Sequence, residues 1–295
     1  LDADSDGEEG KFYVWKKEEL MSLLGHNYAL FADYYNVNRK GYWEHENYIL
    51  LRDEDDKTLA EKHSISLEDL RAIMADCQKV LMAERDKRIR PGLDDKTLTS
   101  WNGLMLKGYV DAYLTFGEQH FLDVASENAK FIVKKQLRKD GGLNHSYKKG
   151  RSTINAYLED YAFIVDAFLK LYEATFDVKW LKEADALMAY SIEHFYDDES
   201  GMFFFTSDED PALIARKMEV NDNVIPASNS VMANNLFLLS HHYGREEYKD
   251  KAVQMLNNVI GDVKSYPSGY SNWLNLLINQ VYPFYEVAII GKAAQ

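Results

Sequence analysis

Residues 117–125, 176–184 and 244–252 read GEQHFLDVA, FDVKWLKEA and GREEYKDKA. In each stretch a helix-like segment ends at a short break, and the next helix carries an aromatic residue followed four positions later by an alanine. The pairs are Phe121 with Ala125, Trp180 with Ala184, and Tyr248 with Ala252. The aromatic residues lie 59 and 68 residues apart, which suits a long helical hairpin plus a connecting loop. The chain therefore predicts a ring of stacked helical hairpins.

Apolar periodicity predicts three hairpins and one further helix. The predicted hairpins cover residues 97–116 with 119–137, 154–176 with 179–195, and 227–243 with 246–260, and the last helix covers 271–281. The first helix of each hairpin is apolar on most faces and the second on one stripe, which indicates an inner and an outer ring. We expect an all-α fold, an (α/α)6-type toroid with short β segments in the connecting loops.

Composition limits the classes of function. At 295 residues and 46% hydrophobic content, the chain can bury about three quarters of its unfolded surface, and we expect one domain over residues 1–295. A net charge of −14 repels phosphate backbones, so no nucleic acid partner is expected. The single cysteine, Cys77, excludes intrachain disulfides and is expected to be buried and inert. No membrane-length apolar run or signal peptide is visible, which favours a cytoplasmic protein without a membrane partner.

Four longer strings carry a family resemblance. They are DADSDGEEGKFYVW at 2–15, RIRPGLDDKTLTSWNGL at 88–104, LEDYA at 158–162 and ASNSV at 227–231. The chain resembles the spermatogenesis-associated, thioredoxin-like family over essentially its whole length. This resemblance implies a helical toroid similar to those of N-acylglucosamine 2-epimerases and six-hairpin glycosidases, joined in the family to an N-terminal thioredoxin-like domain. It implies no established reaction.

The chain is expected to be a fragment of a longer protein. The thioredoxin-like domain of the family is absent from the sequence, and we expect it to be a partner of the toroid in the full-length protein. A strand-like run at 287–291 also has nothing after it to pair with. Fast hydrogen exchange is therefore expected there.

Acidic residues gather where the inner helices are expected to begin. Counting back twenty residues from each aromatic leads to Trp101, Asp160 and Ser228, which should share one end of the ring. Asp95 precedes the first inner helix, and Glu159 and Asp160 begin the second. Carboxylates paired across a pocket are the catalytic groups of glycosidases. Capping of helix N-termini is the alternative role for such side chains.

Adjacent helix positions point about 100° apart, so only one of Glu159 and Asp160 is expected to face inward. The repeat register selects Asp160. We expect Asp160→Asn to abolish turnover while the fold stays intact, and Glu159→Gln to have a smaller effect.

His145 follows the turn Gly141-Gly142 and is expected over the same rim. An imidazole there could move a proton on a sugar, as epimerase chemistry requires. A histidine on a loop can equally be a hydrogen-bonding wall residue, and the epimerases of this fold use more than one histidine.

Several further residues are candidates for substrate binding. Trp101 and Tyr161 could stack on sugar rings, whereas core packing is the alternative for such aromatic residues. The polar candidates for hydroxyl groups are Asn102, Arg216, Asp222 and Asn229. No cofactor and no metal are expected, because histidine pairs with metal-ligand spacing are absent from the sequence.

These residues favour a carbohydrate-active or sugar-binding domain with an acidic, aromatic pocket. If it is an enzyme, glycoside hydrolase-like and sugar epimerase-like chemistry both remain open. The alternative is a non-enzymatic module that recognises a ligand or protein alongside the thioredoxin-like domain. A third hypothesis is a scaffold whose pocket is filled by its own side chains.

Overall fold

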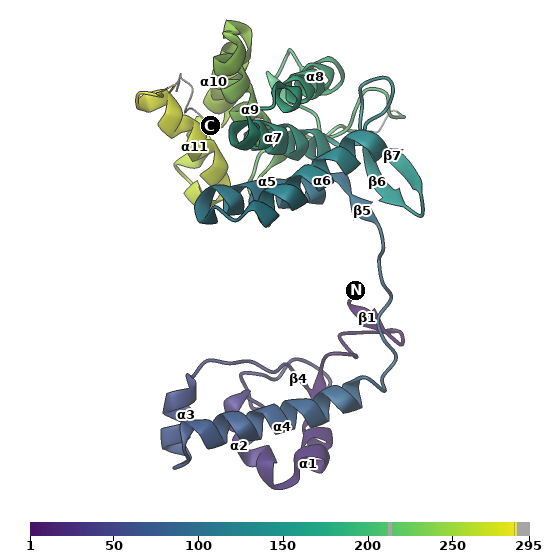
Figure 1. The fold of residues 1–295 in the computed structure, drawn as a ribbon, viewed down its shortest axis with the longest axis vertical. Coiled ribbons are helices and arrows are strands. Elements are labelled where there is room, and N and C mark those ends of the chain that lie inside the picture. Colours follow the sequence, from purple (N-terminus) through teal and green to yellow (C-terminus); the bar gives the residue numbers. More distant parts are fainter. Residues whose placement is uncertain (212–213, 286, 288–295) are drawn as a thin grey trace. The chain divides into compact units, whose positions relative to one another are not determined.

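The computed structural model describes residues 1–211, 214–285 and 287. It divides into two compact units, Leu1–Asp95 and Lys96–Gln295 (Figure 1), each of which is described by itself. The single domain expected over 1–295 stays a prediction. The expected strand at 287–291 lies outside the described residues except for Val287.

The first unit is a small helical body with short strands. Its elements are β1 (Asp4–Ser5), β2 (Glu8–Glu9), β3 (Trp15–Lys16), α1 (Lys17–Leu24), a 3-10 turn (Gly25–Asn27), α2 (Tyr28–Tyr34), β4 (Asn47–Tyr48), α3 (Asp56–Lys62) and α4 (Leu67–Arg85). Ser66 caps α4 by accepting the Asp69 N–H at 3.0 Å. Cys77 lies buried in the core of this unit with Leu70 and Phe31, and the inert role expected for it fits that place.

The second unit is built from helical hairpins. Its elements are β5 (Thr97–Leu98), α5 (Thr99–Phe116), α6 (Gln119–Lys135), β6 (Asn144–Lys148), β7 (Arg151–Asn155), α7 (Leu158–Thr175), α8 (Val178–Phe195), β8 (Tyr196–Asp197), β9 (Met202–Phe203), α9 (Ser228–Tyr243), α10 (Glu246–Val263), a 3-10 turn (Pro267–Tyr270) and α11 (Ser271–Val281). In its described residues the pairs α5/α6, α7/α8 and α9/α10 are followed by α11 alone (Figure 1).

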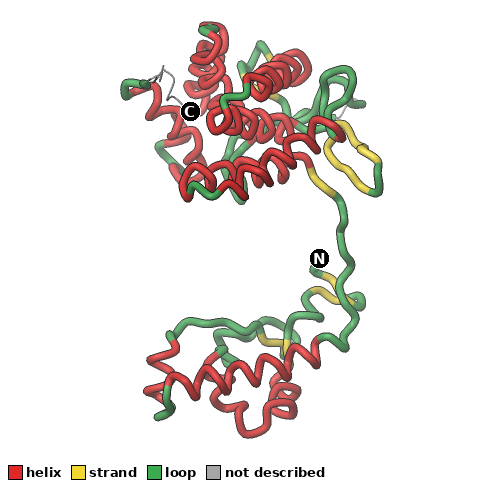
Figure 2. The backbone as a smooth tube through the Cα atoms, in the orientation of Figure 1, coloured by secondary structure: helices red, strands yellow, loops and turns green. Residues whose placement is uncertain are grey.

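The hairpins pack with an inner and an outer set of helices. Helices α5, α7, α9 and α11 contact one another in that order, while α6, α8 and α10 each pack on their own hairpin partner. Apolar side chains cover nearly all of α7, so most of that helix is buried. The predicted all-α class, with inner and outer helices of a toroid and short strands in the loops, is confirmed (Figure 2). Among the described residues, no helix combines the length and the apolar character needed to cross a bilayer.

The breaks seen in the sequence are left-handed helix ends. Gly117, Phe176 and Gly244 each close an inner helix with a positive φ, and each donates its N–H to a carbonyl of the last turn. This αL cap reverses the chain within two or three residues. The repeated break therefore produces the repeated hairpin.

The loop between α6 and α7 holds a β-hairpin where a helix start was expected at residue 154. Strands β6 and β7 pair antiparallel, and β5 adds to β6 as a third strand. Lys149 and Gly150 between them both have positive φ, as a two-residue type I′ turn requires. The hairpin delays the start of α7 to Leu158 and carries His145 on β6.

Helices α5 and α7 cross closely at Gly103. A Cβ at this position would lie 2.8 Å from the carbonyl carbon of Phe163 and 2.9 Å from its oxygen. Only glycine therefore permits this approach, which brings the first turns of the two helices together.

We expect Gly103→Ala to lower the free energy of unfolding by about 1–3 kcal/mol, because the added methyl forces the two helices apart. Gly108→Ala is the matched control on the same helix, since nothing lies within 4 Å of its Cβ position. It should raise stability by about 0.5–1 kcal/mol. Urea unfolding of both variants measures the difference, and a Gly103→Ala variant as stable as the wild type would contradict the close crossing.

Candidate functional site

Asp160 is the buried centre of a polar cluster where α5 and α7 begin. Its Oδ1 accepts the Ser100 N–H of α5 at 2.7 Å. Its Oδ2 accepts the Tyr157 N–H at 2.9 Å, which caps its own helix. The side chain is fully buried. Asp160 therefore caps two helices at once, which is the alternative role considered from the sequence.

His145 completes the set of donors around this carboxylate. Its Nδ1 lies 2.9 Å from Asp160 Oδ2. Because an ionised carboxylate only accepts hydrogen bonds, Nδ1 carries the proton and Nε2 is left as the basic atom. The hydrogen bond that His145 donates to Asp160 raises the pKa of His145, although burial opposes the rise. Burial raises the pKa of Asp160, and its bonds to His145, Tyr157 and Ser100 oppose that rise.

Glu159 lies beside this pair. Its Oε1 accepts the Ser100 hydroxyl at 3.2 Å, and a ligand atom from each of Glu159, Asp160 and His145 lies within 4.8 Å of the other two. Burial and the Asp160 charge raise the pKa of Glu159. The predicted choice of Asp160 over Glu159 as the inward-facing carboxylate is not confirmed, because both lie near the start of α5. The first turn of α7 directs both toward the start of α5.

The other inner helices begin in the same manner. Glu219 accepts both the N–H and the hydroxyl of Ser228 at the start of α9. Asp222 accepts the Ala227 N–H at 2.9 Å and the Asn272 N–H of α11 at 2.7 Å. Carboxylates thus hold the positive ends of the inner helices. Asp222, predicted to bind substrate, instead caps the starts of α9 and α11.

Bonds between the loops support the predicted common end for Trp101, Asp160 and Ser228. Leu158, which opens α7, donates its N–H to Phe205, and the Phe203 N–H donates to Asn229 in α9. One short segment after α8 therefore joins the starts of α7 and α9. Because Asp160 joins α7 to α5, three helix starts meet.

Two candidates lie at this end without entering the cluster. Trp101 follows Ser100 on α5 and is 64% exposed, so its ring is open to solvent. Asn102 donates to the Leu98 carbonyl and accepts from Asn128, both at short range. Asp95 belongs to the first unit, and so it is described apart from Asp160.

Three other candidates serve packing, contrary to the predicted pocket role. Tyr161 is fully buried, stacks on Tyr190 and accepts the Leu143 N–H. Asn229 is fully buried and bonds both backbone groups of Phe203. The Arg216 guanidinium covers the Phe204 ring at 4.2 Å. The Tyr161 hydroxyl and the Asn229 amide are thus bonded within the protein, as burial demands, whereas Nε of Arg216 is buried without a hydrogen-bond partner among the described residues.

Tyr157 was not identified from the sequence. The Tyr157 ring meets His145 edge-on at 4.9 Å and stacks on Phe205 at 5.1 Å. They give the cluster an aromatic wall. The N-cap position of Tyr157, one residue before an apolar helix, was the available signal.

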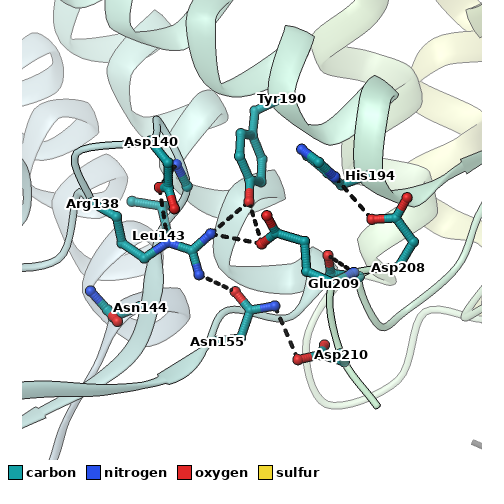
Figure 3. A network of polar contacts seen from close by, with 12 residues as sticks. Arg138, Asp140, Leu143, Asn144, Asn155, Tyr190, His194, Asp208, Glu209 and Asp210 are labelled. Atoms are coloured by element: carbon teal, nitrogen blue, oxygen red, sulfur yellow. Dashed lines mark hydrogen bonds and ion pairs between the residues drawn. The ribbon is translucent and has the colours of Figure 1, made fainter. Parts of the chain in front are cut away.

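A second polar network, also missed from the sequence, fixes the loops nearby (Figure 3). Arg138 is at its centre and donates to Asp140, Asn155, Tyr190 and Glu209. Figure 3 shows these side chains converging from the loop after α6, from β7, from α8 and from the segment after β9. The network ties the loop that precedes His145 to α8 and so helps to place the imidazole.

His145, Glu159 and Asp160 are also a possible ligand set for a metal ion. However, both oxygens of Asp160 already accept N–H groups, and His145 Nδ1 faces the carboxylate. A cation would have to displace these donors. The arrangement fits proton transfer better than metal binding.

No family model matches the chain. An uncharacterised protein of Caenorhabditis elegans is 31% identical over 282 residues, which cover 88% of this chain and 38% of the relative. Spermatogenesis-associated protein 20 of Homo sapiens is 27% identical over 326 residues, which cover 98% of this chain and 41% of the relative. The chain therefore spans about two fifths of the length of these relatives. The matches confirm the predicted resemblance.

Two solved structures have similar folds. A GH76 alpha-mannanase of Bacteroides thetaiotaomicron is 15% identical with a TM-score of 0.47, covering 59% of this chain and 48% of the mannanase. A sugar epimerase from a ruminal bacterium is 18% identical with a TM-score of 0.48, covering 58% of this chain and 45% of the epimerase.

The contacts of Asp160 correct the expectation that Asp160→Asn leaves the fold intact. An asparagine turns one acceptor into a donor, so at least one buried N–H loses its partner, at about 1–3 kcal/mol for each group. Glu159→Gln keeps an oxygen for Ser100 and should change stability by less than about 1 kcal/mol. Denaturant unfolding of both variants compares them. Equal stabilities would contradict the double cap.

The stability should also depend on pH through His145. Its pKa is raised in the folded state, so its bond to Asp160 stabilises fully below the unfolded pKa of about 6.5 and this contribution fades as the pH rises through the folded value. The free energy of unfolding of wild type minus that of His145→Gln should thus be largest below about pH 6.5. A difference that grows toward high pH would contradict the assigned bond.

Proposed function

We propose that this chain, which resembles the spermatogenesis-associated, thioredoxin-like family, is a carbohydrate-active domain that moves protons on a free sugar. The observation that carries the proposal is the bond between His145 Nδ1 and the buried Asp160, with Glu159 beside it. The choice of a sugar rests on the toroid fold that the resemblance implies. The acid and base roles rest on the geometry of the cluster.

In this reaction His145 Nε2 acts as the base. It removes the proton from the carbon next to the sugar carbonyl, and the electron pair shifts to form a carbon–carbon double bond. Glu159, whose pKa is raised by burial and by the Asp160 charge, is the acid of the proposed step and donates a proton to the carbonyl oxygen, which gives an enediol. Return of the proton to the same carbon on the opposite face, with the carbonyl re-formed as Glu159 takes back its proton, gives the epimer. Protonation of the former carbonyl carbon instead, with loss of the proton from the neighbouring hydroxyl, gives the isomer. Asp160 positions His145 and stabilises its charged form.

Glycoside hydrolysis fits this arrangement less well. That reaction needs a second carboxylate that reaches the sugar or a water next to it. Asp160 is fully buried, and both of its oxygens accept hydrogen bonds from the protein. It can therefore orient a neighbour but cannot attack a substrate.

The setting of this activity is also part of the proposal. The expected partners are a small sugar ligand and the thioredoxin-like domain of the full-length protein, and the expected compartment is the cytoplasm. The exposed Trp101 favours a recognition module as the second candidate, since it offers an aromatic face for a ligand or domain without any chemistry.

Deuterium incorporation at the carbon next to the carbonyl, followed by NMR in D2O, tests the proposal on a panel of aldoses and ketoses. Wild type should exchange that proton, and His145→Gln and Glu159→Gln should each slow the exchange by about 10²–10⁴-fold. Asp160→Asn is unsuitable as a test because its fold is expected to be weakened.

A glycoside panel run in parallel separates the alternatives. Hydrolysis without exchange would replace the proposal with glycosidase chemistry. Ligand binding without exchange or hydrolysis would favour the recognition module. The absence of exchange with every sugar would overturn the proposed reaction.

A further inference from the structure

A cavity of about 320 Å³ lies between the four inner helices. Its apolar wall includes Phe163 of α7 and Val231 of α9. Its polar lining comes from α5, α7, α9 and α11, with Lys107, Asp166, Lys170, Asn234, Asn272 and Asn275. This volume is at the lower end of small-molecule sites. Polar groups facing an apolar wall give the cavity the character of a binding site.

The cavity continues along the face of α7 that carries Glu159. Glu159, Phe163, Asp166 and Lys170 are spaced by four, three and four residues, which places them on one side of a helix. Asp166 lies seven residues beyond Glu159, or about 10 Å along the axis. A molecule in the cavity would thus lie on the same side of α7 as Glu159.

The charges of the cavity are nearly balanced before any ligand binds. Lys170 lies 2.9 Å from Glu173 and 3.7 Å from Asp111, and Lys107 lies 3.4 Å from Asp111. Both ammonium groups therefore already have carboxylate partners, which leaves no excess of positive charge to attract an anion.

Asp166 stands out in this set because, within the described part of the chain, it makes no hydrogen bond or ion pair of its own. Burial raises its pKa to about 6, so its charge is poorly solvated. The Asn234 Nδ2 group donates to the backbone carbonyls of Ser230 and Asn272, and the Asn272 Nδ2 group donates to the Ser230 hydroxyl. Their Oδ1 atoms are left as acceptors. The cavity thus offers acceptors that call for a ligand rich in donors.

We propose that this cavity binds a neutral, hydroxyl-rich molecule of monosaccharide size, whose hydroxyl groups donate to Asp166 and the asparagine amides while its carbon face lies on Phe163 and Val231. The inference deepens the proposed function, because it names where the sugar would bind, but it is tested by binding alone.

Calorimetry with glucose, mannose and sorbitol tests the site, with glucuronate and glucosamine as charged counterparts. Asp166→Asn keeps the shape of the side chain and should weaken binding of the neutral compounds at least tenfold. Asn275→Ala, at an exposed position of α11, should weaken it as well without endangering the fold. Asp123→Asn is the control, since Asp123 is an exposed carboxylate on α6 that accepts a hydrogen bond from Gln119 and lies outside the cavity lining.

The outcomes distinguish this site from the proposed reaction. Binding that Asp166→Asn weakens and Glu159→Gln retains supports the site, even if no deuterium exchange occurs. Exchange that Asp166→Asn leaves unchanged, with unchanged affinity, supports the reaction and overturns the site. Failure of every neutral compound to bind, or tighter binding of glucuronate or glucosamine, also overturns it.

Discussion

The carboxylate of Asp160 is the contact on which the second unit depends most. It receives the Ser100 N–H from α5, the Tyr157 N–H that begins α7, and the His145 imidazole from β6. Three elements that are distant in sequence therefore meet at two oxygen atoms. A buried charge is tolerated only when its acceptors are filled, and the positive ends of two helices help to fill them here.

The same contact decides which groups remain available for chemistry. Because both oxygens of Asp160 accept hydrogen bonds from the protein and the side chain is fully buried, the proposed reaction assigns the chemistry to His145 Nε2 and to the Glu159 carboxyl beside it. A base held by a buried carboxylate, with a carboxylic acid beside it, is a common arrangement for proton transfer. Structure and reactivity are thus divided between two neighbouring residues of α7.

Much of the fold could be predicted because it depends on local signals. The αL breaks at Gly117 and Gly244 and the apolar stripes specified the hairpins, and the helix 271–281 was predicted to the residue. The β6–β7 hairpin was not predicted, because the apolar pattern that begins at Ile154 was interpreted as the start of the next helix. Its conformation is set by the turn at Lys149 and Gly150 and by pairing with β5.

The site was predicted only in part, and the reason lies in the inner helices. When a helix is apolar on all faces, its sequence pattern does not show which way its few polar side chains point. Tyr161 and Asn229 were therefore assigned to a pocket although they bond within the core. Asp166 was overlooked because nothing in the sequence shows that four helices leave a space around it.

The cavity between the inner helices lies on the face of α7 that also carries Glu159 of the acid–base cluster. A base such as His145 acts only on a molecule held within hydrogen-bond reach, and the exposed start of α5 offers little to hold one. The inner face of α7 offers groups that could hold a ligand, because Phe163 and Asp166, which line the cavity, follow Glu159 along it. In the proposed reaction, the acid–base group at the end of the inner helices would act on one end of a small polyol, and the cavity on the same face of α7 would bind the remainder.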